Sequence, residues 1–302
     1  MHDPNTVSND RKALLLGLAA VLLWSTAATA FKLALRELDV FQLVAWSVTA
    51  SAAALLAIVC WQGRQGLLWS SLRARPGFFL LLGAINPLLY YLVLLHAYDL
   101  LPAQQAQTIN YTWAITLALL AVPLLGQRLG GRDLLAAALG YSGVVIIATE
   151  GQPLAMNFTS LPGVALALGS TLVWALYWIL NTRNKGDPVV SLCLNFLLAV
   201  PAAWLVCVIF SSAATGGWRG LTAALYVGLF EMGITFALWS SALRLASSVA
   251  RIGNLIFLSP LFSLVLIATV LGETIHPATL VGLALIIPGV LLQQAGSPAR
   301  EA

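Results

Sequence analysis

Charged residues are scarce in this sequence, and their scarcity decides the class of protein. Only 9% of the 302 residues are Asp, Glu, Lys or Arg, whereas 60% are hydrophobic, and the mean hydropathy is +0.91. A soluble domain usually has about a quarter of its residues charged. The composition therefore predicts an all-α integral membrane protein, because a segment that crosses a bilayer must satisfy its backbone hydrogen bonds internally.

The residues and motifs of common active sites are also few. Cys60, Cys193 and Cys207 lie in apolar runs without CxxC spacing, so neither a disulfide framework nor a zinc site is predicted. His96 and His276 have no second histidine at ligand spacing. The chain has no Walker, GxSxG or HExxH sequence and no paired carboxylates, so we expect no enzyme activity, no metal and no cofactor. A membrane enzyme, the main rival class, would need a cluster of ionisable residues at the interface, and the sequence has none.

The positive charges indicate an orientation instead of a nucleic-acid partner. A formal net charge of +4 would suit nucleic acid only if the cations formed a patch, and here they are scattered through short connections. If the N-terminus is inside, 12 of the 15 Lys and Arg residues fall in cytoplasmic segments and only Lys32, Arg36 and Arg219 fall outside. Positive residues stay cytoplasmic, so we expect both termini in the cytoplasm.

Ten segments are apolar and long enough to cross a bilayer, which takes about 20 residues. The polar start MHDPNTVSNDRK leads into an apolar run without a small-residue cleavage site, so the first helix is predicted to be retained. The linkers are too short for a soluble domain. The predicted spans are approximately 12–33, 40–62, 76–97, 102–125, 133–149, 160–182, 188–210, 219–243, 247–270 and 277–295.

The two halves of the chain repeat. The segment from Leu125 to Val145 aligns without a gap with Leu271 to Leu291. Further matches are Gly126 with Gly272, Gln127 with Glu273, Gly143 with Gly289, Trp24 with Trp174 and Gly83 with Gly228. Because each half holds five helices, an odd number, the second must enter the membrane from the opposite side. We therefore predict two inverted repeats, residues 1–150 and 151–302, around a central cavity, as in many alternating-access transporters.

The most informative stretch runs from Pro102 to Pro123. Gln104, Gln107, Thr108 and Tyr111 fall at i, i+3, i+4 and i+7, which places them on one helix face, with Asn110 beside it. Such a buried stripe is costly unless it bonds to neighbouring helices, to water or to a substrate. The prediction is that this face lines something wet.

A second group of polar residues lies near the middle of the third and eighth spans. Asn86 and Glu231 occupy matching positions, and Tyr90 and Thr235 lie one turn further on. They predict a midplane site. The alternative is that Asn86 and Glu231 are structural hydrogen-bond partners that hold helices together.

The sixth span carries an aromatic face, with Trp174, Tyr177, Trp178 and Asn181 at i, i+3, i+4 and i+7. We expect Trp174 and Tyr177 to face the cavity, together with Trp24 of the matching helix, and Trp178 to belong to the interfacial aromatic belt. Asn254 and Phe257 on the ninth span are rough counterparts of Thr108 and Tyr111, although Phe257 also suits core packing.

The arrangement resembles a known family. Ten helices in two five-helix repeats, with LLGQRLGG and VLGETIHP closing the fourth and ninth helices, is similar to the EamA branch of the drug/metabolite transporter superfamily. The run from Asn86 to Leu129 looks like the aromatic amino acid exporters of that branch. One departure is that EamA repeats often end the fourth helix with Glu where this chain has Gln127.

The resemblance implies export of neutral amino acids, aromatic ones included, from the cytoplasm across the inner membrane of a bacterium, by alternating access without ATP. The residues alone indicate a carrier of small molecules, and the alternative is proton-coupled efflux of cationic or lipophilic drugs. Partners are then a small-molecule substrate and membrane lipid, not nucleic acid, and a monomer is expected. The candidate substrate-binding residues are Tyr90, Gln107, Asn110, Tyr111, Trp174, Tyr177, Asn86, Glu231, Trp24 and Asn254.

Overall fold

The computed structural model describes residues 4–126, 130–155, 158–214, 217–246 and 252–296, and these residues form helices and connections without a strand. Eight helical stretches are long and apolar enough to cross a membrane, judged by length and composition. They are Asn9–Leu35, Val40–Trp61, Pro76–Leu100, Ala103–Leu125, Gly131–Ala148, Leu161–Asn181, Pro188–Phe210 and Trp218–Leu245. The chain is thus an all-helical multi-pass membrane protein, as its composition predicts.

The helix boundaries follow the apolar segments closely. The second span, predicted at 40–62, is Val40–Trp61, and the third, predicted at 76–97, continues to Leu100. Two shorter apolar helices, Leu255–Leu271 and Pro277–Leu292, occupy the positions predicted for the ninth and tenth spans. The predicted start of the ninth span, residues 247–251, lies outside the described residues, as does Gln127.

The chain divides into two compact units that interleave both halves of the sequence. Unit 1 comprises Met1–Leu88 and Lys185–Leu271, and unit 2 comprises Leu89–Asn184 and Gly272–Ala302. The chain therefore passes between the units three times, once within the third span. The predicted repeats, residues 1–150 and 151–302, are a division of the sequence and stay a prediction.

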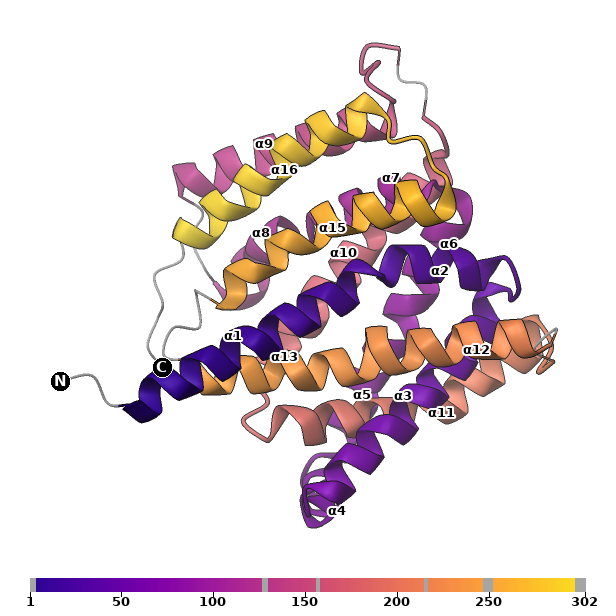
Figure 1. The fold of residues 1–302 in the computed structure, drawn as a ribbon, viewed down its shortest axis with the longest axis vertical. Helices are drawn as coiled ribbons and strands as arrows, with labels where there is room; N and C mark the ends of the chain where they lie inside the picture. Colours follow the sequence, from indigo (N-terminus) through magenta and orange to yellow (C-terminus); the bar gives the residue numbers. More distant parts are fainter. Residues whose placement is uncertain (1–3, 127–129, 156–157, 215–216, 247–251, 297–302) are drawn as a thin grey trace. The chain divides into compact units, whose positions relative to one another are not determined.

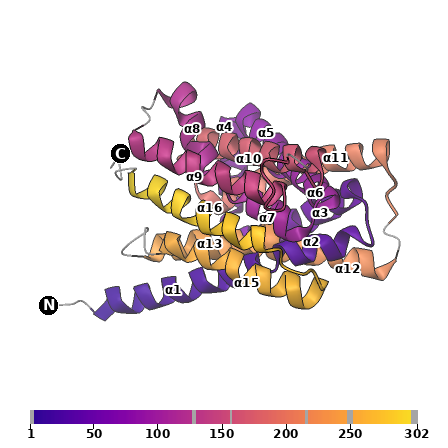
Figure 2. The same ribbon diagram turned by 90° about the horizontal axis from the view of Figure 1, so that it is seen from above.

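Unit 1 is built on two tightly packed helix pairs, α1 with α13 and α3 with α11. Figure 2 shows the first pair side by side. The elements of unit 1 are α1 (Pro4–Ser25), α2 (Ala27–Leu35), α3 (Val40–Trp61), α4 (Gln65–Ala74), α5 (Pro76–Gly83), η1 (Ala84–Leu89, which ends in unit 2), α11 (Pro188–Phe210), α12 (Trp218–Tyr226), η2 (Val227–Gly233), α13 (Ile234–Leu245), η3 (Asn254–Phe257), α15 (Leu258–Leu266) and η4 (Ile267–Leu271).

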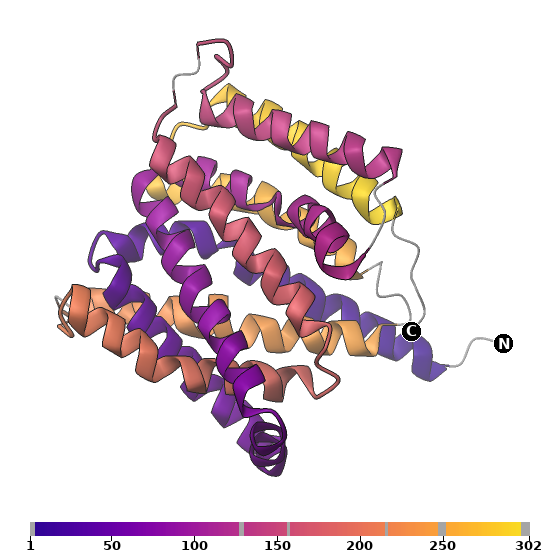
Figure 3. The same ribbon diagram turned by 180° about the vertical axis from the view of Figure 1, so that it is seen from behind.

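Unit 2 contains one long helix pair, α9 with α16, and a second group in which α10 packs on α6, α7 and α8. The α9 and α16 ribbons run side by side in Figure 1, and again in Figure 3, where they are magenta and yellow. The elements of unit 2 are α6 (Tyr90–Leu100), α7 (Ala103–Asn110), α8 (Trp113–Leu125), α9 (Gly131–Ala148), α10 (Leu161–Asn181) and α16 (Pro277–Gly296).

Glycine allows α9 and α16 to approach closely. A Cβ atom on Gly143 would lie 2.7 Å from the carbonyl oxygen of Gly282, and one on Gly282 would lie 2.8 Å from the carbonyl oxygen of Gly143. Further along, a Cβ on Gly289 would lie 2.9 Å from the carbonyl oxygen of Ala136. Small residues at such crossings are typical of helices packed inside membranes, where van der Waals contact drives association.

Three of the spans are interrupted near the polar residues. The third span leaves helical geometry at Asn86 (φ −138°, ψ 117°), within the π-helical turn η1 and just before Pro87. The eighth span widens at η2 and ends that turn at Gly233 (φ −111°, ψ −85°). The fourth span breaks between α7 and α8, at Tyr111 and Thr112. Breaks of this kind release backbone groups from the helical ladder at membrane depth.

Candidate functional site

An aromatic cluster in unit 2 is centred on Trp174 of α10. The ring of Tyr90 from α6 lies 4.5 Å from that of Trp174, and the ring of Tyr177 stacks 5.5 Å from it. Trp113 at the start of α8 and Trp178 of α10 meet Trp174 edge-on, at 6.5 and 5.9 Å. Trp174, Tyr90 and Tyr177 are all buried. The structure thus brings together three residues that the sequence places on two separate helices.

Uncharged polar groups adjoin this cluster. The Asn110 amide on α7 donates to Ser170 Oγ over 2.8 Å, and the Tyr90 hydroxyl donates to Asn110 Oδ1 over 3.5 Å. Within α8, Thr116 Oγ1 bonds to the hydroxyls of Tyr141 and Thr171, each over 2.9 Å. Amides, hydroxyls and aromatic rings therefore meet in unit 2 without a charged side chain among these residues.

Gln107 and Tyr111 complete the set of candidates on the fourth span. Gln107 is buried in α7, and Tyr111, the residue directly after the end of α7, is half-buried. Both lie in unit 2 with Asn110, which is also half-buried.

Gln104, at the head of the predicted stripe, has a different role. Its amide donates to Glu273 Oε2 (3.4 Å) and to the Thr274 carbonyl (3.0 Å). Its Oε1 accepts from the His276 backbone N–H (2.9 Å) and from the Thr279 hydroxyl (2.8 Å). Two donors and two acceptor sites are all an amide side chain has. Gln104 is therefore fully satisfied by the connection before α16 and by Thr279 in the first turn of α16, so at this position the prediction of a wet face is wrong.

Glu273 also caps α7. Its carboxylate accepts from the backbone N–H groups of Ala103 (2.9 Å) and Gln104 (3.4 Å). The first N–H groups of a helix lack partners within it, and a carboxylate there also interacts favourably with the helix dipole. We call Gln104, Glu273 and Thr279 the α7 clamp.

Gln105 anchors the same helix end to a different connection. Its amide donates to Thr159 Oγ1 (3.0 Å) and to Glu150 Oε1 (3.5 Å), and Thr159 in turn donates to Glu150 Oε1 (3.1 Å). The first turn of α7 is thus held by the connection that precedes α10 as well as by the one that precedes α16.

A second aromatic group lies in unit 1. The Trp24 indole N–H of α1 donates to the Glu231 carbonyl in η2 over 3.3 Å. Its ring meets Phe236 and Trp239 of α13 edge-on, at 5.1 and 5.4 Å. The Glu231 side chain is half-buried. The structure therefore joins the candidates Trp24 and Glu231 in unit 1, through a backbone contact of the glutamate.

Asn86 and Asn254 are the remaining candidates. Asn86 is buried in η1, where its Oδ1 accepts no hydrogen bond from the described residues. Asn254 begins the 3₁₀ turn η3, and its side chain lies outside the described part of the chain. The ten candidates thus divide between the two units, with Tyr90, Gln107, Asn110, Tyr111, Trp174 and Tyr177 in unit 2 and Asn86, Glu231, Trp24 and Asn254 in unit 1.

Sequence reasoning missed Ser170 and Trp113. Ser170 precedes Trp174 by four residues and Tyr177 by seven, so it continues the same face of α10, and this spacing was the available signal. Trp113 follows Asn110 by three residues, the spacing of neighbours on one helix face, and this spacing was the available signal. Within the described residues, no three His, Cys, Asp or Glu side chains are grouped as a metal site would require.

The helices and the site define a multi-pass membrane protein whose polar groups are held inside apolar spans. The chain belongs to the EamA-like transporter family, whose pattern matches residues 11–149 and 161–293. This family is part of the drug/metabolite transporter superfamily, so the protein is a transporter and not an enzyme, as the resemblance implies.

Three relatives cover nearly the whole chain. An uncharacterized protein of Pseudomonas aeruginosa is 30% identical, over 97% of this chain and 99% of the relative. The aromatic amino acid exporter YddG of Ancylobacter novellus is 25% identical, over 92% and 95%. A probable terminal-alkyne amino-acid exporter of Streptantibioticus cattleyicolor is 27% identical, over 91% of each chain. A crystal structure with 22% identity shares the fold, with a TM-score of 0.66 over 94% of this chain and 99% of that one.

Proposed function

We propose that this transporter exports neutral amino acids, aromatic ones included, from the bacterial cytoplasm by alternating access and without ATP. The observation that carries the proposal is the cluster in unit 2, where Tyr90, Trp174 and Tyr177 adjoin the Asn110 and Ser170 hydrogen bond. We further propose that the protein acts as a monomer in the inner membrane.

The chemistry of this cluster suits an amino acid zwitterion. The aromatic side chain of a substrate needs adaptable apolar walls, which stacked rings provide, and its charged ends need hydrogen-bonding groups. The Trp178 indole N–H is buried and donates to no acceptor among the described residues, so it is a donor suited to a carboxylate. Neutral donors bind a carboxylate less strongly than arginine does. Weak, permissive binding suits an exporter that acts when the cytoplasmic amino acid is abundant.

Paired contacts support the inverted repeat that alternating access needs. In the alignment of Leu125–Val145 with Leu271–Leu291, Gly143 corresponds to Gly289 and Ala136 to Gly282. The close contact of Gly143 with Gly282 and that of Gly289 with Ala136 are therefore equivalent under the repeat. Such a repeat-related pair is expected when α9 and α16 meet on a two-fold axis.

The glycines of the third and eighth spans make a similar pair of contacts. A Cβ on Gly83 would lie 2.6 Å from the carbonyl oxygen of Asn195 in α11, and one on Gly228 would lie 2.3 Å from that of Ser47 in α3. Gly83 directly precedes the π-helical turn η1, and Gly228 is the second residue of the π-helical turn η2. These matches favour ten spans arranged as two five-helix repeats.

The relatives make amino acids the favoured substrate class. Two of the proteins that resemble this chain over nine-tenths of its length are named as amino acid exporters, one of them for aromatic amino acids. Their identities of 25% and 27% leave the substrate of this chain to experiment.

The test is transport by purified protein in liposomes. Labelled phenylalanine should cross the membrane down its gradient, and Trp174→Phe should slow this flux about tenfold, because it weakens the ring contacts that are worth about 1 kcal/mol each. The matched control is Trp218→Phe, at an exposed residue of α12, which should transport like the wild type. Absence of amino acid flux in protein that moves a lipophilic cation would refute the proposal.

The orientation has its own test. We propose cytoplasmic termini, on the bias of the Lys and Arg residues. In a variant without the three native cysteines, a single cysteine at Gly151 should react in intact cells with a membrane-impermeant reagent, whereas one at Gln65 should react only after lysis. Preferential labelling at Gln65 would reverse the orientation.

Efflux of cations is the second candidate, and the group in unit 1 favours it. Aromatic faces and a carboxylate attract organic cations, and here Trp24, Trp239 and Glu231 lie together. Flux of tetraphenylphosphonium that is lost in Glu231→Gln, without flux of phenylalanine, would establish this function instead.

A further inference from the structure

The short helix α4 (Gln65–Ala74) stands apart from the spans that it connects. It follows α3 at the edge of unit 1, as Figure 1 shows, and none of its ten residues is buried. It packs on α11 and α5, with Leu68 and Leu72 less exposed than its other large apolar residues. Because α3 forms the second span and α5 begins the third, the helix between them lies at the membrane boundary.

Large apolar side chains on this helix remain uncovered by the protein. Trp69 is 57% exposed and Leu67 is 47% exposed, and Trp61 at the end of α3 is 87% exposed. Tryptophan prefers the headgroup region of a bilayer, and helices with one apolar and one basic face lie in that plane.

The charges near α4 in the sequence are all positive. No Asp or Glu occurs between Val40 and Tyr98, while Arg64, Arg73 and Arg75 fall within and beside α4. The guanidinium of Arg73 lies 4.6 Å from the centre of the Trp69 ring, one turn away, and that of Arg75 lies 4.0 Å from the centre of the Phe78 ring. This basic and aromatic face complements an acidic lipid surface.

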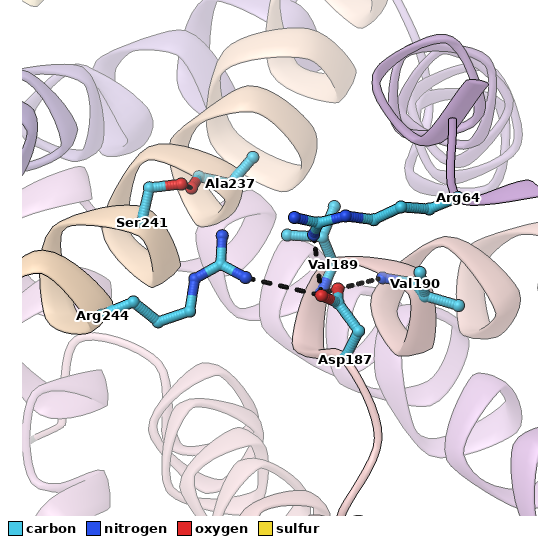
Figure 4. A network of polar contacts seen from close by, with 7 residues as sticks. All are labelled: Arg64, Asp187, Val189, Val190, Ala237, Ser241 and Arg244. Carbon is cyan, nitrogen blue, oxygen red and sulfur yellow. Dashed lines mark hydrogen bonds and ion pairs between the residues drawn. The ribbon is translucent and has the colours of Figure 1, made fainter. Parts of the chain in front are cut away.

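Arg64 fixes the helix to the rest of unit 1 (Figure 4). Its guanidinium bonds to Asp187 Oδ2 over 2.8 Å, and Arg244 of α13 reaches the same oxygen over 3.4 Å. Asp187 Oδ1 meanwhile accepts from the backbone N–H groups of Val189 and Val190 at the start of α11. The start of α4 is thereby tied to α11, which holds the Trp69 and Arg73 face in place.

We propose that α4 is an interfacial helix that binds the phosphate headgroups of anionic phospholipids through Arg73 and Arg75, with Trp69 seated between the headgroups and the acyl chains. The lipid is the occupant because the site combines two cations with exposed rings at the membrane boundary. At low salt, the attraction between one arginine and an acidic bilayer surface changes the affinity for anionic lipid about fivefold.

Native mass spectrometry of the purified full-length chain tests this proposal. Wild-type protein titrated with phosphatidylglycerol should retain more lipid than with phosphatidylcholine, and the variant R73Q/R75Q should bind phosphatidylglycerol roughly twenty-five-fold more weakly. The control R219Q removes a similar arginine, 5.8 Å from the centre of the Trp218 ring, and should bind like the wild type.

Two further readouts distinguish a bound phospholipid from a free anion. Lipids with brominated acyl chains should quench wild-type tryptophan fluorescence more than that of Trp69→Phe, since the ring sits beside the chains. Equal binding of both lipids by the wild type, or unchanged phosphatidylglycerol binding by R73Q/R75Q, would overturn the proposal. Competition by soluble glycerol phosphate as effective as by phosphatidylglycerol would also overturn it, because it would reveal a site for a free anion.

Discussion

The two ends of helix α7 contain the same kinds of side chain and use them in opposite ways. At its start, Gln104 makes four hydrogen bonds within the α7 clamp and the adjoining connection, and Gln105 is tied to Thr159. At its end, Asn110 bonds to Ser170 and Tyr90 beside stacked aromatic rings, and the helix breaks just after Asn110. The comparison separates polar residues that hold helices and connections together from those that we propose to act in transport.

The largest expected difference between the two ends of α7 is in how much each contributes to the stability of the protein. Glu273→Ala removes the cap of α7 and one acceptor of Gln104, so we expect the free energy of unfolding to fall by about 2 kcal/mol. The measurement is the midpoint of thermal unfolding in detergent. The control is Asp133→Ala, which removes a carboxylate that accepts an exposed hydrogen bond from the Gly130 N–H at the start of α9 and should cost less than half as much.

The clamp variant also tests whether the start of α7 is only structural. Phenylalanine flux per folded molecule should be nearly unchanged in Glu273→Ala. If flux falls tenfold while the unfolding midpoint stays at the wild-type value, then the clamp takes part in transport and the comparison fails.

Substitutions at the other end of α7, where Asn110 lies, should instead change the rate of transport. Asn110→Ala removes the bonds to Ser170 and Tyr90, and we expect phenylalanine flux to fall three- to tenfold, as one or two net hydrogen bonds of about 1 kcal/mol would give. Asn181→Ala, on the same unit but without a side-chain hydrogen bond among the described residues, is the matched control. A loss of stability in Asn110→Ala as large as that in Glu273→Ala would make Asn110 another structural residue.

The smallest effect is expected at Glu231, whose contact with Trp24 uses the backbone carbonyl. Glu231→Gln keeps that contact and the volume of the side chain, so phenylalanine flux should stay within about twofold of the wild type. Complete loss of flux in folded, membrane-inserted protein would mean that the carboxylate itself is required, for a proton or a cationic substrate. Flux with and without a pH gradient separates these two outcomes.

The local sequence is enough to predict a structural feature where a side-chain pattern is compatible with only one conformation. The second span, predicted at 40–62, is Val40–Trp61, because a run of about 20 apolar residues in lipid can only form a helix. Asp39 at its start accepts from the Phe41 and Gln42 N–H groups, a capping pattern carried by neighbouring residues. Likewise, the spacing of Trp174 and Tyr177 predicts a shared face, and their rings stack.

Other features depend on contacts between residues that are far apart in the sequence. Gln104 and Gln107 look alike in an apolar helix, yet Gln104 bonds to Glu273, Thr274, His276 and Thr279, all in the other half of the chain, which no local pattern reveals. Trp113 of α8 likewise meets Trp174 of α10, a contact between two separate helices that the local pattern of neither helix reveals.

The sequence by itself determined that this chain is a helical multi-pass membrane protein, because transfer of apolar residues into lipid and backbone hydrogen bonding depend on composition and segment length. It also determined the set of polar residues from which a site could be built. Only the tertiary structure decided which of them are consumed in the α7 clamp and which lie beside the aromatic rings. The physical reason is that an amide in an apolar helix is stable with any suitable partner, and the fold alone supplies that partner.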